Sequence, residues 1–579
     1  MNAKESNRDF RIRVAFWVLG AVLGFLQAWP SRFDAEDNTV SYLDMGSYFF
    51  HGHHWAIVNG FWNPVYAFLL GLTVAVTKPS LYWEYPTVHL LVFIVFLFTM
   101  TCFDYFLRQW MQLRPDLGPE EKASSEPDWA WISIAYTIFL WSCLEWIHVD
   151  SAAQDLLVAG FFYLSCGLLV TISSGRAKWG AFLGLGLTLG LNYLTKFFLL
   201  PICLLILVTA WLAARGKARY VVISAIAFVA LAAPFIAALS VQKGRLTYGE
   251  AATYDYAVNV NRIQRYNWQG DAQMPLAHPT RQIFPSPATF EFREPFKGTY
   301  PVLYDLTYWY EGVKPRFHFR QQIKALASNL LWLSETLFFA LNGLLLGSVF
   351  LVLYGTGRGW SVLSDMLRFW FLLVPCVATT ALYAFVFYAP QYLAAAFVVL
   401  LLCLFLSAAF NRDLPKYRLV SGVAILQLAM FVALVGLPVT LHVFGIHPFY
   451  SRKAEKASYQ QVAEKAIEMG LKPGDQIASL EHSTLGMSQW AHLARIEIIA
   501  EVSYRAGEEG DANNFWNADP LTQERVIQKL SQTGARAVIS QDAPIGAGAG
   551  RWLEIGTTGY YLYWLTPAPN DSLRGELAR

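Results

Sequence analysis

Residues 85–107 read YPTVHLLVFIVFLFTMTCFDYFL, a nearly continuous apolar run. As a helix, a run of about 20 apolar residues crosses the roughly 30 Å hydrocarbon layer of a membrane. Similar runs recur near residues 12–30, 129–147, 153–173, 179–195, 198–214, 219–240, 328–354, 368–388, 391–410 and 419–443. The sequence therefore predicts a polytopic α-helical membrane protein with about eleven transmembrane helices.

The composition excludes two other classes of protein. Of the 579 residues, 55% are hydrophobic and only 15% are charged, so a soluble globular protein is excluded. The net charge is only +2 and the basic residues stand in short clusters, which excludes a nucleic-acid-binding surface. The cysteines lie in or beside apolar runs without a CxxC pair, which indicates core packing. They are Cys102, Cys143, Cys166, Cys203, Cys376 and Cys403.

Basic residues in short loops predict the orientation of the chain, because such loops stay cytoplasmic. With the N-terminus inside, every basic cluster falls on the cytoplasmic face. The clusters are Lys4, Arg8, Arg11 and Arg13; Arg108, Arg114 and Lys122; Arg176 and Lys178; Arg215, Lys217 and Arg219; Arg358 and Arg368; and Arg412, Lys416 and Arg418. Trp29 and Pro30 stand where a signal-peptide cleavage site would need small residues, so the first span is expected to be an uncleaved anchor.

Three long polar regions then lie on the opposite, non-cytoplasmic side: residues 31–84, residues 241–327 and the tail from 446. The tail alternates helical patterns at 455–469 and 520–533 with strand-like runs near 476–480, 495–501, 536–540 and 558–565. This alternation predicts a soluble α/β domain. We therefore expect a membrane domain over residues 1–445 and a periplasmic α/β domain over residues 446–579.

The first polar region carries an acidic motif, Asp34-Ala-Glu-Asp37, which continues to Asp44 and Gly46. Asp34 or Asp37 could simply cap a helix. Alternatively Asp37 is a general base at the membrane surface that deprotonates a hydroxyl. Three histidines, His51, His53 and His54, are better explained as interfacial side chains than as metal ligands. The apolar stretch from 64 to about 77 is short for a span, so a re-entrant or interfacial helix is expected.

Ionisable side chains also stand at two later turns on the same side. Asp150 fits a helix cap, whereas Asp155 falls about one turn inside the next helix, where charge is costly without a purpose. Lys196 stands alone between two apolar runs. It could be a lysine that reaches to the interface, or a cation that pairs with the phosphate of a lipid-linked substrate.

The region 241–327 is a long loop rich in aromatic and arginine side chains, including Arg262, Arg265, Tyr308 and Trp309. Long loops without secondary structure are uncommon unless they are functional. Aromatic faces stack on sugar rings and arginine binds phosphate in a fork. The loop therefore fits a glycolipid site, although a cap that lies on the interface would have a similar composition.

Taken in order, four motifs resemble those of the GT-C fold glycosyltransferases, a superfamily that includes protein O-mannosyltransferases and aminoarabinose transferases. The resemblance covers roughly residues 10–215. The motifs are Asp37 to Gly46, Gly60-Phe-Trp-Asn-Pro64-Val-Tyr, Gln154-Asp155-Leu-Leu-Val-Ala, and Leu191-Asn-Tyr-Leu-Thr-Lys196.

The resemblance implies an inverting transfer of a sugar from a polyprenyl-phosphate donor to an acceptor at the outer face of a bacterial inner membrane. By position, Asp37 would be the catalytic base and Asp155 the second acidic residue, with Asp150 as its rival. Lys196 would be the basic residue near the donor phosphate, and from the composition of the long loop Arg262 and Arg265 are further candidates to bind this phosphate. Acceptor or sugar binding is expected from Tyr42, Trp62, His54, Tyr308 and Trp309.

Two features depart from the superfamily pattern. Gln154 stands where a proline usually precedes the second acid, and Ala389-Pro-Gln391-Tyr392 replaces an Arg-Tyr pair. No nucleotide-binding loop is present. The acidic loop could hold a divalent cation such as Mg²⁺ or Mn²⁺, although no ligand set is compelling. Two alternatives stay open: an O-antigen ligase- or polymerase-type glycan transferase, and a lipid-linked sugar flippase or transporter.

Overall fold

A computed structural model gives the fold of most of the chain. It describes residues 7–113, 128–150, 153–264, 268, 276–292, 295, 298–338, 343, 347–348, 361–408, 416–444, 458–480, 484–502, 514–541 and 551–566. The chain divides into two compact units. Unit 1 consists of residues 1–31, 89–260 and 317–450, and unit 2 of residues 32–88, 261–316 and 451–579.

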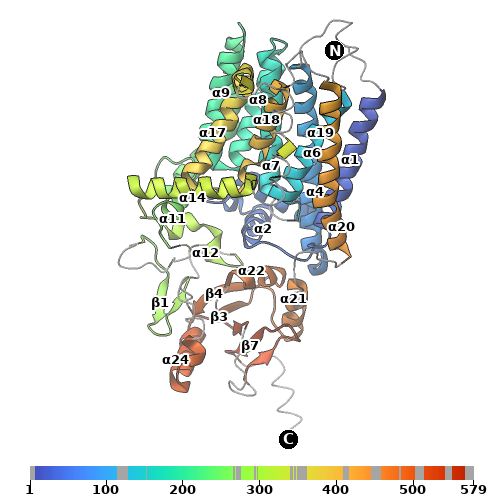
Figure 1. Ribbon diagram of the computed structural model, residues 1–579. Coiled ribbons are helices and arrows are strands. Elements are labelled where there is room, and N and C mark those ends of the chain that lie inside the picture. Colours follow the sequence, from blue (N-terminus) through green and yellow to red (C-terminus); the bar gives the residue numbers. More distant parts are fainter. Residues whose placement is uncertain are drawn as a thin grey trace. The chain divides into compact units, whose positions relative to one another are not determined.

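Unit 1 is a helical bundle whose long helices run side by side (Figure 1). Helix α4 (Glu84–Trp110) enters it from unit 2. The other helices of the bundle are α1 (Asn7–Ala28), α6 (Asp128–Trp141), α7 (Ala153–Ser173), α8 (Trp179–Thr195), α9 (Leu200–Ala213), α10 (Val221–Lys243), α17 (Trp370–Val386), α18 (Pro390–Ala408), α19 (Lys416–Phe431) and α20 (Leu437–Val443). Shorter elements of this unit are α11 (Ala251–Asn259) and α16 (Ser361–Met366).

Seven helices in the described part of the chain are long and apolar enough to cross a membrane. They are Leu81–Leu113, Asp128–Ile147, Gln154–Ser173, Ala218–Lys243, Ser361–Val386, Pro390–Ser407 and Leu419–Val443. Each corresponds to a predicted span, and the polytopic helical fold is confirmed. The predicted spans at 179–195 and 198–214 are the shorter apolar helices α8, with 17 residues, and α9, with 14. Helix α1 is less apolar because Arg8, Asp9, Arg11 and Arg13 occupy its first two turns.

The predicted span at 328–354 differs from what the structure contains. Its described part, to residue 338, belongs to α14 (Phe319–Phe338). This helix runs across the bundle and not along it (Figure 1). Basic side chains at Arg320 and Lys324 alternate with apolar ones, and Leu331 and Trp332 are exposed. Such a two-faced helix suits an interface better than a hydrocarbon core. Residues 339–342, 344–346 and 349–354 lie outside the described ranges.

Unit 2 begins with two helices that cross closely. Helix α2 (Asp37–Phe50) packs against α3 (Pro64–Thr77), the short apolar helix that was expected to be re-entrant or interfacial. Gly46 and Gly71 stand at the crossing, where an added Cβ on Gly46 would lie 2.3 Å from the carbonyl oxygen of Ala67. Only glycine allows the two backbones to approach this closely.

A seven-stranded sheet joins the second polar region to the tail, in the order β1-β2-β4-β3-β5-β7-β6. The tail supplies β3 (Gln476–Leu480), β4 (Glu497–Val502), β5 (Ala537–Ser540), β6 (Leu553–Glu554) and β7 (Tyr561–Trp564). Strands β1 (Arg281–Phe284) and β2 (Thr289–Glu291) come from the loop, and β2 pairs antiparallel with β4. The three central strands β4, β3 and β5 are parallel and buried on both faces.

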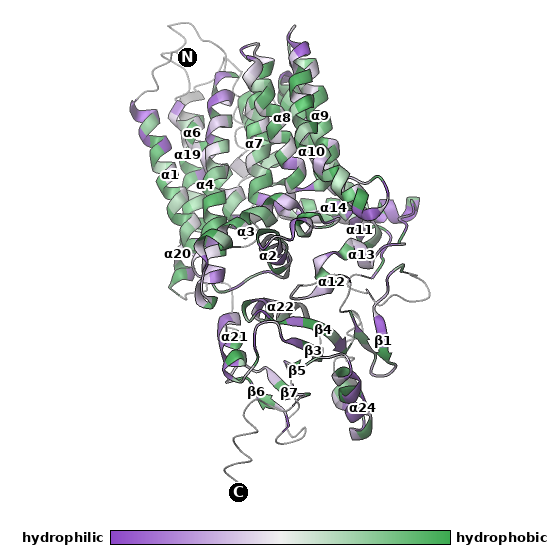
Figure 2. Cartoon of the chain, turned by 180° about the vertical axis from the view of Figure 1, so that it is seen from behind, coloured by the Kyte–Doolittle hydropathy of each residue, from purple (hydrophilic) through white to green (hydrophobic). Residues whose placement is uncertain are grey.

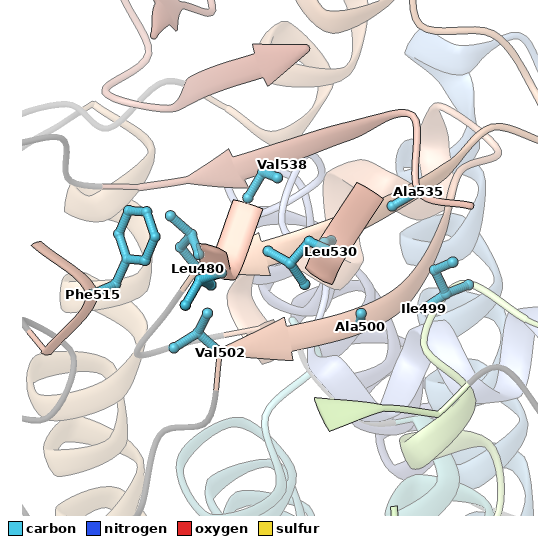
Figure 3. Packing of buried hydrophobic residues seen from close by; sticks show 10 residues of the cluster. Leu480, Ile499, Ala500, Val502, Phe515, Leu530, Ala535 and Val538 are labelled. Carbon is cyan, nitrogen blue, oxygen red and sulfur yellow. The ribbon is translucent and has the colours of Figure 1, made fainter. Parts of the chain in front are cut away.

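Helices complete this α/β fold, which confirms the predicted class of the tail. They are α21 (Tyr459–Glu468), α22 (Thr484–Leu493), α23 (Asn514–Asn517) and α24 (Pro520–Ser531). Ser458 and Gln461 form a capping box at the start of α21, and Asp519 caps α24. Leu480, Val502 and Leu530 belong to the apolar cluster that holds α24 on the sheet (Figure 3).

The colouring by hydropathy distinguishes the two units. Bundle helices are apolar along most of their length, whereas the helices and strands of the tail alternate polar and apolar residues (Figure 2). Unit 2 also packs residues 32–88, 261–316 and 451–579 into one body. The distribution of basic loops predicts that these three segments share one side of the membrane.

Candidate functional site

The site in unit 1 is built where α7 begins and α8 ends. Lys196 follows the last residue of α8 in an extended conformation, and its backbone N–H donates to the carbonyl oxygens of Asn192 and Tyr193. Its Nζ atom lies 2.7 Å from Oδ1 of Asp155, in the first turn of α7. Beside this ion pair, the side chain of Gln154 donates to the carbonyl oxygen of Thr195. One ion pair and one hydrogen bond therefore join the first turn of α7 to the end of α8 and the residue that follows it.

The Lys196–Asp155 pair is withdrawn from solvent. The side chains are 14% and 12% exposed, so both charges depend on each other for neutralisation. Asp155 also lies at a helix N-terminus, where the backbone dipole favours a negative charge. Asp150 makes no hydrogen bond or ion pair with the described residues. Of the two rival acids, Asp155 is therefore the one that the fold places against the lysine.

Two tyrosines surround the lysine ammonium. Nζ of Lys196 lies 3.4 Å from the ring centroid of Tyr392, in α18, and 5.8 Å from that of Tyr383, in α17. The two rings stack with centroids 4.9 Å apart, and Tyr383 also stacks on Phe198. These faces attract a cation through their quadrupoles. Tyr392 belongs to the Ala-Pro-Gln-Tyr motif that departs from the superfamily pattern, so this turn does reach the lysine.

Tyr383 is a site residue that the sequence analysis missed. Its hydroxyl is buried and finds no hydrogen-bond partner among the described residues. Buried polar groups without a partner are uncommon and often mark a place where a ligand binds. Nothing in the sequence distinguishes this tyrosine, because it stands inside an apolar span like many other aromatic residues.

The predicted base, Asp37, is the first residue of α2. Its backbone is described, but its side chain lies outside the description. Glu36 precedes it as the N-cap residue, in an extended conformation. Asp44, two turns later in the same helix, is buried and bonded to Thr299 and His492. Asp37 in the acidic motif therefore begins helix α2, and Asp44 holds this helix in unit 2 through buried hydrogen bonds.

The aromatic residues predicted to bind sugar differ in their exposure. Tyr42 and Trp62 are buried and pack edge to face, and the indole N–H of Trp62 donates to the carbonyl oxygen of Leu303. A sugar can stack only on a ring with an open face, so these two rings serve to hold α2 in unit 2. His54 is exposed, in a short 3-10 helix beside Phe49.

The candidate residues of the second polar region, residues 241–327, have separate surroundings and form no single cluster among the described residues. The ring of Tyr308 stacks on His278 at 4.2 Å, and Nε2 of His278 lies 3.2 Å from a carboxylate oxygen of Glu311. Trp309 is buried, with its indole N–H 3.3 Å from the carbonyl oxygen of Pro301. Arg262 adopts a left-handed backbone conformation. Arg265 lies outside the described residues.

The sequence left open whether a divalent cation binds, and in the described part of the chain no three His, Cys, Asp or Glu side chains are grouped to hold a metal. All six cysteines are buried and unbridged, as the sequence analysis expected for packing residues.

Comparisons with known proteins bear on the fold. No protein-family model matches the chain, and no curated protein matches its sequence. Among solved structures, ArnT from Cupriavidus metallidurans bound to undecaprenyl phosphate matches with a TM-score of 0.52 and 10% identity, over 96% of this chain and 98% of that one. The apo ArnT structure has a TM-score of 0.49 at 11% identity, covering 96% and 97%. An Archaeoglobus fulgidus oligosaccharyltransferase has a TM-score of 0.48 at 12% identity, covering 92% of this chain and 68% of that one.

Of these three, the match to the lipid-bound ArnT structure alone exceeds a TM-score of 0.5. At 10% identity it shows a common fold across nearly the whole of both chains. The chain thus has the GT-C fold that its sequence motifs predicted.

Proposed function

We propose that this chain is a membrane glycosyltransferase that takes a sugar from a polyprenyl-phosphate donor. The observation that carries the proposal is the Lys196 site in an apolar bundle. It combines a largely buried ammonium, a carboxylate that pairs with this ammonium, and the hydroxyl of Tyr383, which finds no partner among the residues that the structure describes. A phosphate group attached to a lipid would need such donors at the edge of hydrocarbon. The shared fold with a protein bound to undecaprenyl phosphate supports the same ligand class.

The proposed chemistry is a single displacement at the anomeric carbon. An acceptor hydroxyl oxygen forms the new bond to this carbon while the bond to the donor phosphate oxygen breaks, which inverts the configuration. Asp37 takes the hydroxyl proton as general base. Lys196 leaves Asp155 to pair with the phosphate and stabilises the charge that develops as the phosphate departs. Asp155 keeps the ammonium neutralised when the donor is absent.

The orientation follows from the basic loops. The N-terminus is proposed to be cytoplasmic, and unit 2, with Asp37, to lie in the periplasm of a bacterial cell. Arg262 and Arg265, in the same unit, are proposed as further phosphate contacts, and His54 and Tyr308, whose rings are not fully buried, as acceptor contacts.

The test is a transfer assay on the purified chain in lipid nanodiscs. Radiolabelled polyprenyl-monophosphate sugars and polyprenyl-diphosphate glycans are supplied separately, with crude envelope glycolipid as acceptor. We expect transfer from the monophosphate donors, and a loss of at least about 100-fold in Asp37→Asn, the usual scale for removing a general base. Asp34→Asn, a neighbouring acid, is the matched control and should keep transfer.

Two results would count against the proposal. Transfer from the diphosphate glycans alone would indicate a ligase or polymerase. Movement of labelled lipid across the bilayer without transfer would indicate a flippase.

A further inference from the structure

A charge cluster in unit 2 joins segments that are far apart in the sequence. We define it as Asp44, Glu84, His492 and Arg495. Nδ1 of His492 lies 2.9 Å from Oδ1 of Asp44, and Nε2 lies 2.9 Å from Oε1 of Glu84. Arg495 contacts both oxygens of Glu84, at 3.1 and 2.5 Å. The imidazole therefore sits between two carboxylates that come from α2 and from the start of α4.

The three central members are almost completely buried. The side chains of His492 and Glu84 are 3% and 2% exposed, and that of Asp44 is 10% exposed. Arg495 closes the cluster toward solvent at 44%. Asp44 also accepts from the backbone N–H of Thr299 at 2.8 Å and from its hydroxyl at 3.1 Å. All three segments of unit 2 thus contribute to one buried network.

The geometry determines the protonation state of His492. An ionised carboxylate can only accept hydrogen bonds, so the two 2.9 Å contacts to Asp44 and Glu84 favour an imidazole that donates from both nitrogens. Nε2 also lies 3.2 Å from Nη1 of Arg495, a longer contact than the one to Glu84. His492 is then an imidazolium, and two positive charges balance two negative ones. Burial alone lowers the pKa of His492, but the hydrogen bonds and charges of Asp44 and Glu84 outweigh it and raise the pKa above its usual value.

The surrounding titratable groups do not disturb this balance. Burial and the neighbouring Asp44 raise the pKa of Tyr48 to about 12, so this phenol stays neutral. Tyr85 donates from its hydroxyl to the carbonyl oxygen of Gln489. Glu497 is bonded to the side chain of Gln476, in the neighbouring strand.

Helix α2 connects the charge cluster to the proposed base. Asp37 and Asp44 are seven residues apart, about two turns, so they lie on the same side of the helix. The crossing with α3 at Gly46 and Gly71 holds the helix on another side. Without the imidazolium, Asp44 keeps its hydrogen bonds from Thr299 and Glu84 keeps Arg495, but both buried carboxylates lose the cation that lies between them. We therefore expect α2 to shift.

We propose that His492 is a positioning residue, which as an imidazolium fixes α2 and thereby the orientation of Asp37. The part that concerns Asp37 rests on the proposed function. The part that concerns α2 does not, because it follows from contacts within unit 2.

The first experiment is hydrogen–deuterium exchange on the full chain in nanodiscs, comparing wild type, His492→Gln and Asp44→Asn. We expect the amides of residues 38–50 to exchange at least tenfold faster in both variants, while those of β3 and β5 stay protected and report that the tail is folded. His53→Gln, which changes an exposed histidine of the same unit, is the matched control. Unchanged exchange over 38–50 in a folded His492→Gln chain would overturn the proposal.

The second experiment uses pH. A group whose pKa is raised by folding contributes stability that is complete below its unfolded pKa and disappears as pH rises through the folded pKa. The difference in thermal midpoint between wild type and His492→Gln should therefore be largest near pH 6, below the usual histidine pKa of about 6.5, and shrink at higher pH. A difference that is constant over this range would contradict an imidazolium.

Kinetics then separate positioning from binding. We expect His492→Gln to lower kcat at least tenfold and to leave KM for the lipid donor unchanged, because none of the proposed phosphate contacts, Lys196, Arg262 and Arg265, lies on α2. An equal rise in KM would overturn the link to Asp37. A wild-type chain that transfers no sugar would refute the proposed function, whereas the exchange and pH experiments need no substrate and test His492 independently.

Discussion

Lys196 illustrates how a single residue can be both a structural ion pair and a binding group. Its ammonium is neutralised by Asp155 and faces Tyr392, so replacement by alanine removes a cation and strands a buried carboxylate. A fall in activity of Lys196→Ala alone would therefore be ambiguous. A variant that removes both charges resolves it.

We predict that Lys196→Ala/Asp155→Ala folds with a thermal midpoint closer to wild type than Lys196→Ala, yet binds undecaprenyl phosphate about 10- to 100-fold more weakly, the scale of one charge-assisted hydrogen bond. Binding is measured by native mass spectrometry or lipid-dependent thermal shift. Lys178→Ala, at the exposed start of the same helix α8, should bind as wild type does. Undiminished binding by the double variant would remove Lys196 from the donor site.

The variant Tyr383→Phe distinguishes a role in lipid binding from a purely structural role. Removing this buried hydroxyl, which has no hydrogen-bond partner in the described part of the chain, should leave the lipid-free protein as stable as before, or slightly more stable. If the hydroxyl binds the donor phosphate, Tyr383→Phe weakens lipid binding about tenfold or more. Tyr163→Phe, in a ring packed against Phe103 and Phe139, is the matched control. Equal lipid affinity in all three proteins would exclude Tyr383 from the site.

Among the helices and strands, those that depend on the pattern of one segment could be predicted from the sequence. Strand pairing between distant segments could not. The four strand-like runs of the tail match β3, β4, β5 and β7, because each is a short apolar run bounded by turns. Strands β1 and β2 have four and three residues and no alternating pattern. Strand β1 pairs with β2, and the other partner of β2, strand β4, comes about 200 residues later, so no local pattern indicates that these two strands join the sheet.

The candidate site shows the same division. Asp155 and Lys196 could be found because charges are rare beside apolar runs. The tyrosines around the lysine, the buried state of Tyr42 and Trp62, and the charge cluster all depend on how distant helices pack. The span predicted at 328–354 differs over its described part because residues 328–338 continue a helix that begins at Phe319, and a count that starts at 328 omits Arg320 and Lys324.

Helix α2 gives a prediction at this scale. A methyl group at Gly46 would meet the backbone of α3, which cannot move as a side chain can. We expect Gly46→Ala to destabilise unit 2 by about 1–3 kcal/mol, the usual cost of overpacking. The measurement is a lower thermal midpoint together with faster exchange in α2 and α3. Gly180→Ala, at a helical glycine with open space around it, should be neutral or stabilising, and a neutral Gly46→Ala would contradict the close crossing.

For the whole molecule, the buried cysteines make the orientation easy to measure. Because all six are buried, a single introduced cysteine can be labelled selectively. We predict that Asn38→Cys and Gln532→Cys react with a membrane-impermeant maleimide on intact spheroplasts, whereas Lys178→Cys reacts only after permeabilisation. All three positions are exposed. Labelling of Asn38→Cys and Gln532→Cys from opposite sides would contradict unit 2 as one body, and labelling of both from the cytoplasm would invert the proposed orientation.

The pairing of β2 with β4 also has a consequence for biosynthesis. Ribosomes add about 5–20 residues per second, so roughly 10–40 s pass between the synthesis of these two strands. During that interval the hairpin β1–β2 presents an unpaired edge, a feature that invites association with other chains. The edge of β2 therefore stays open to other chains until β4 has been synthesised and the sheet can close.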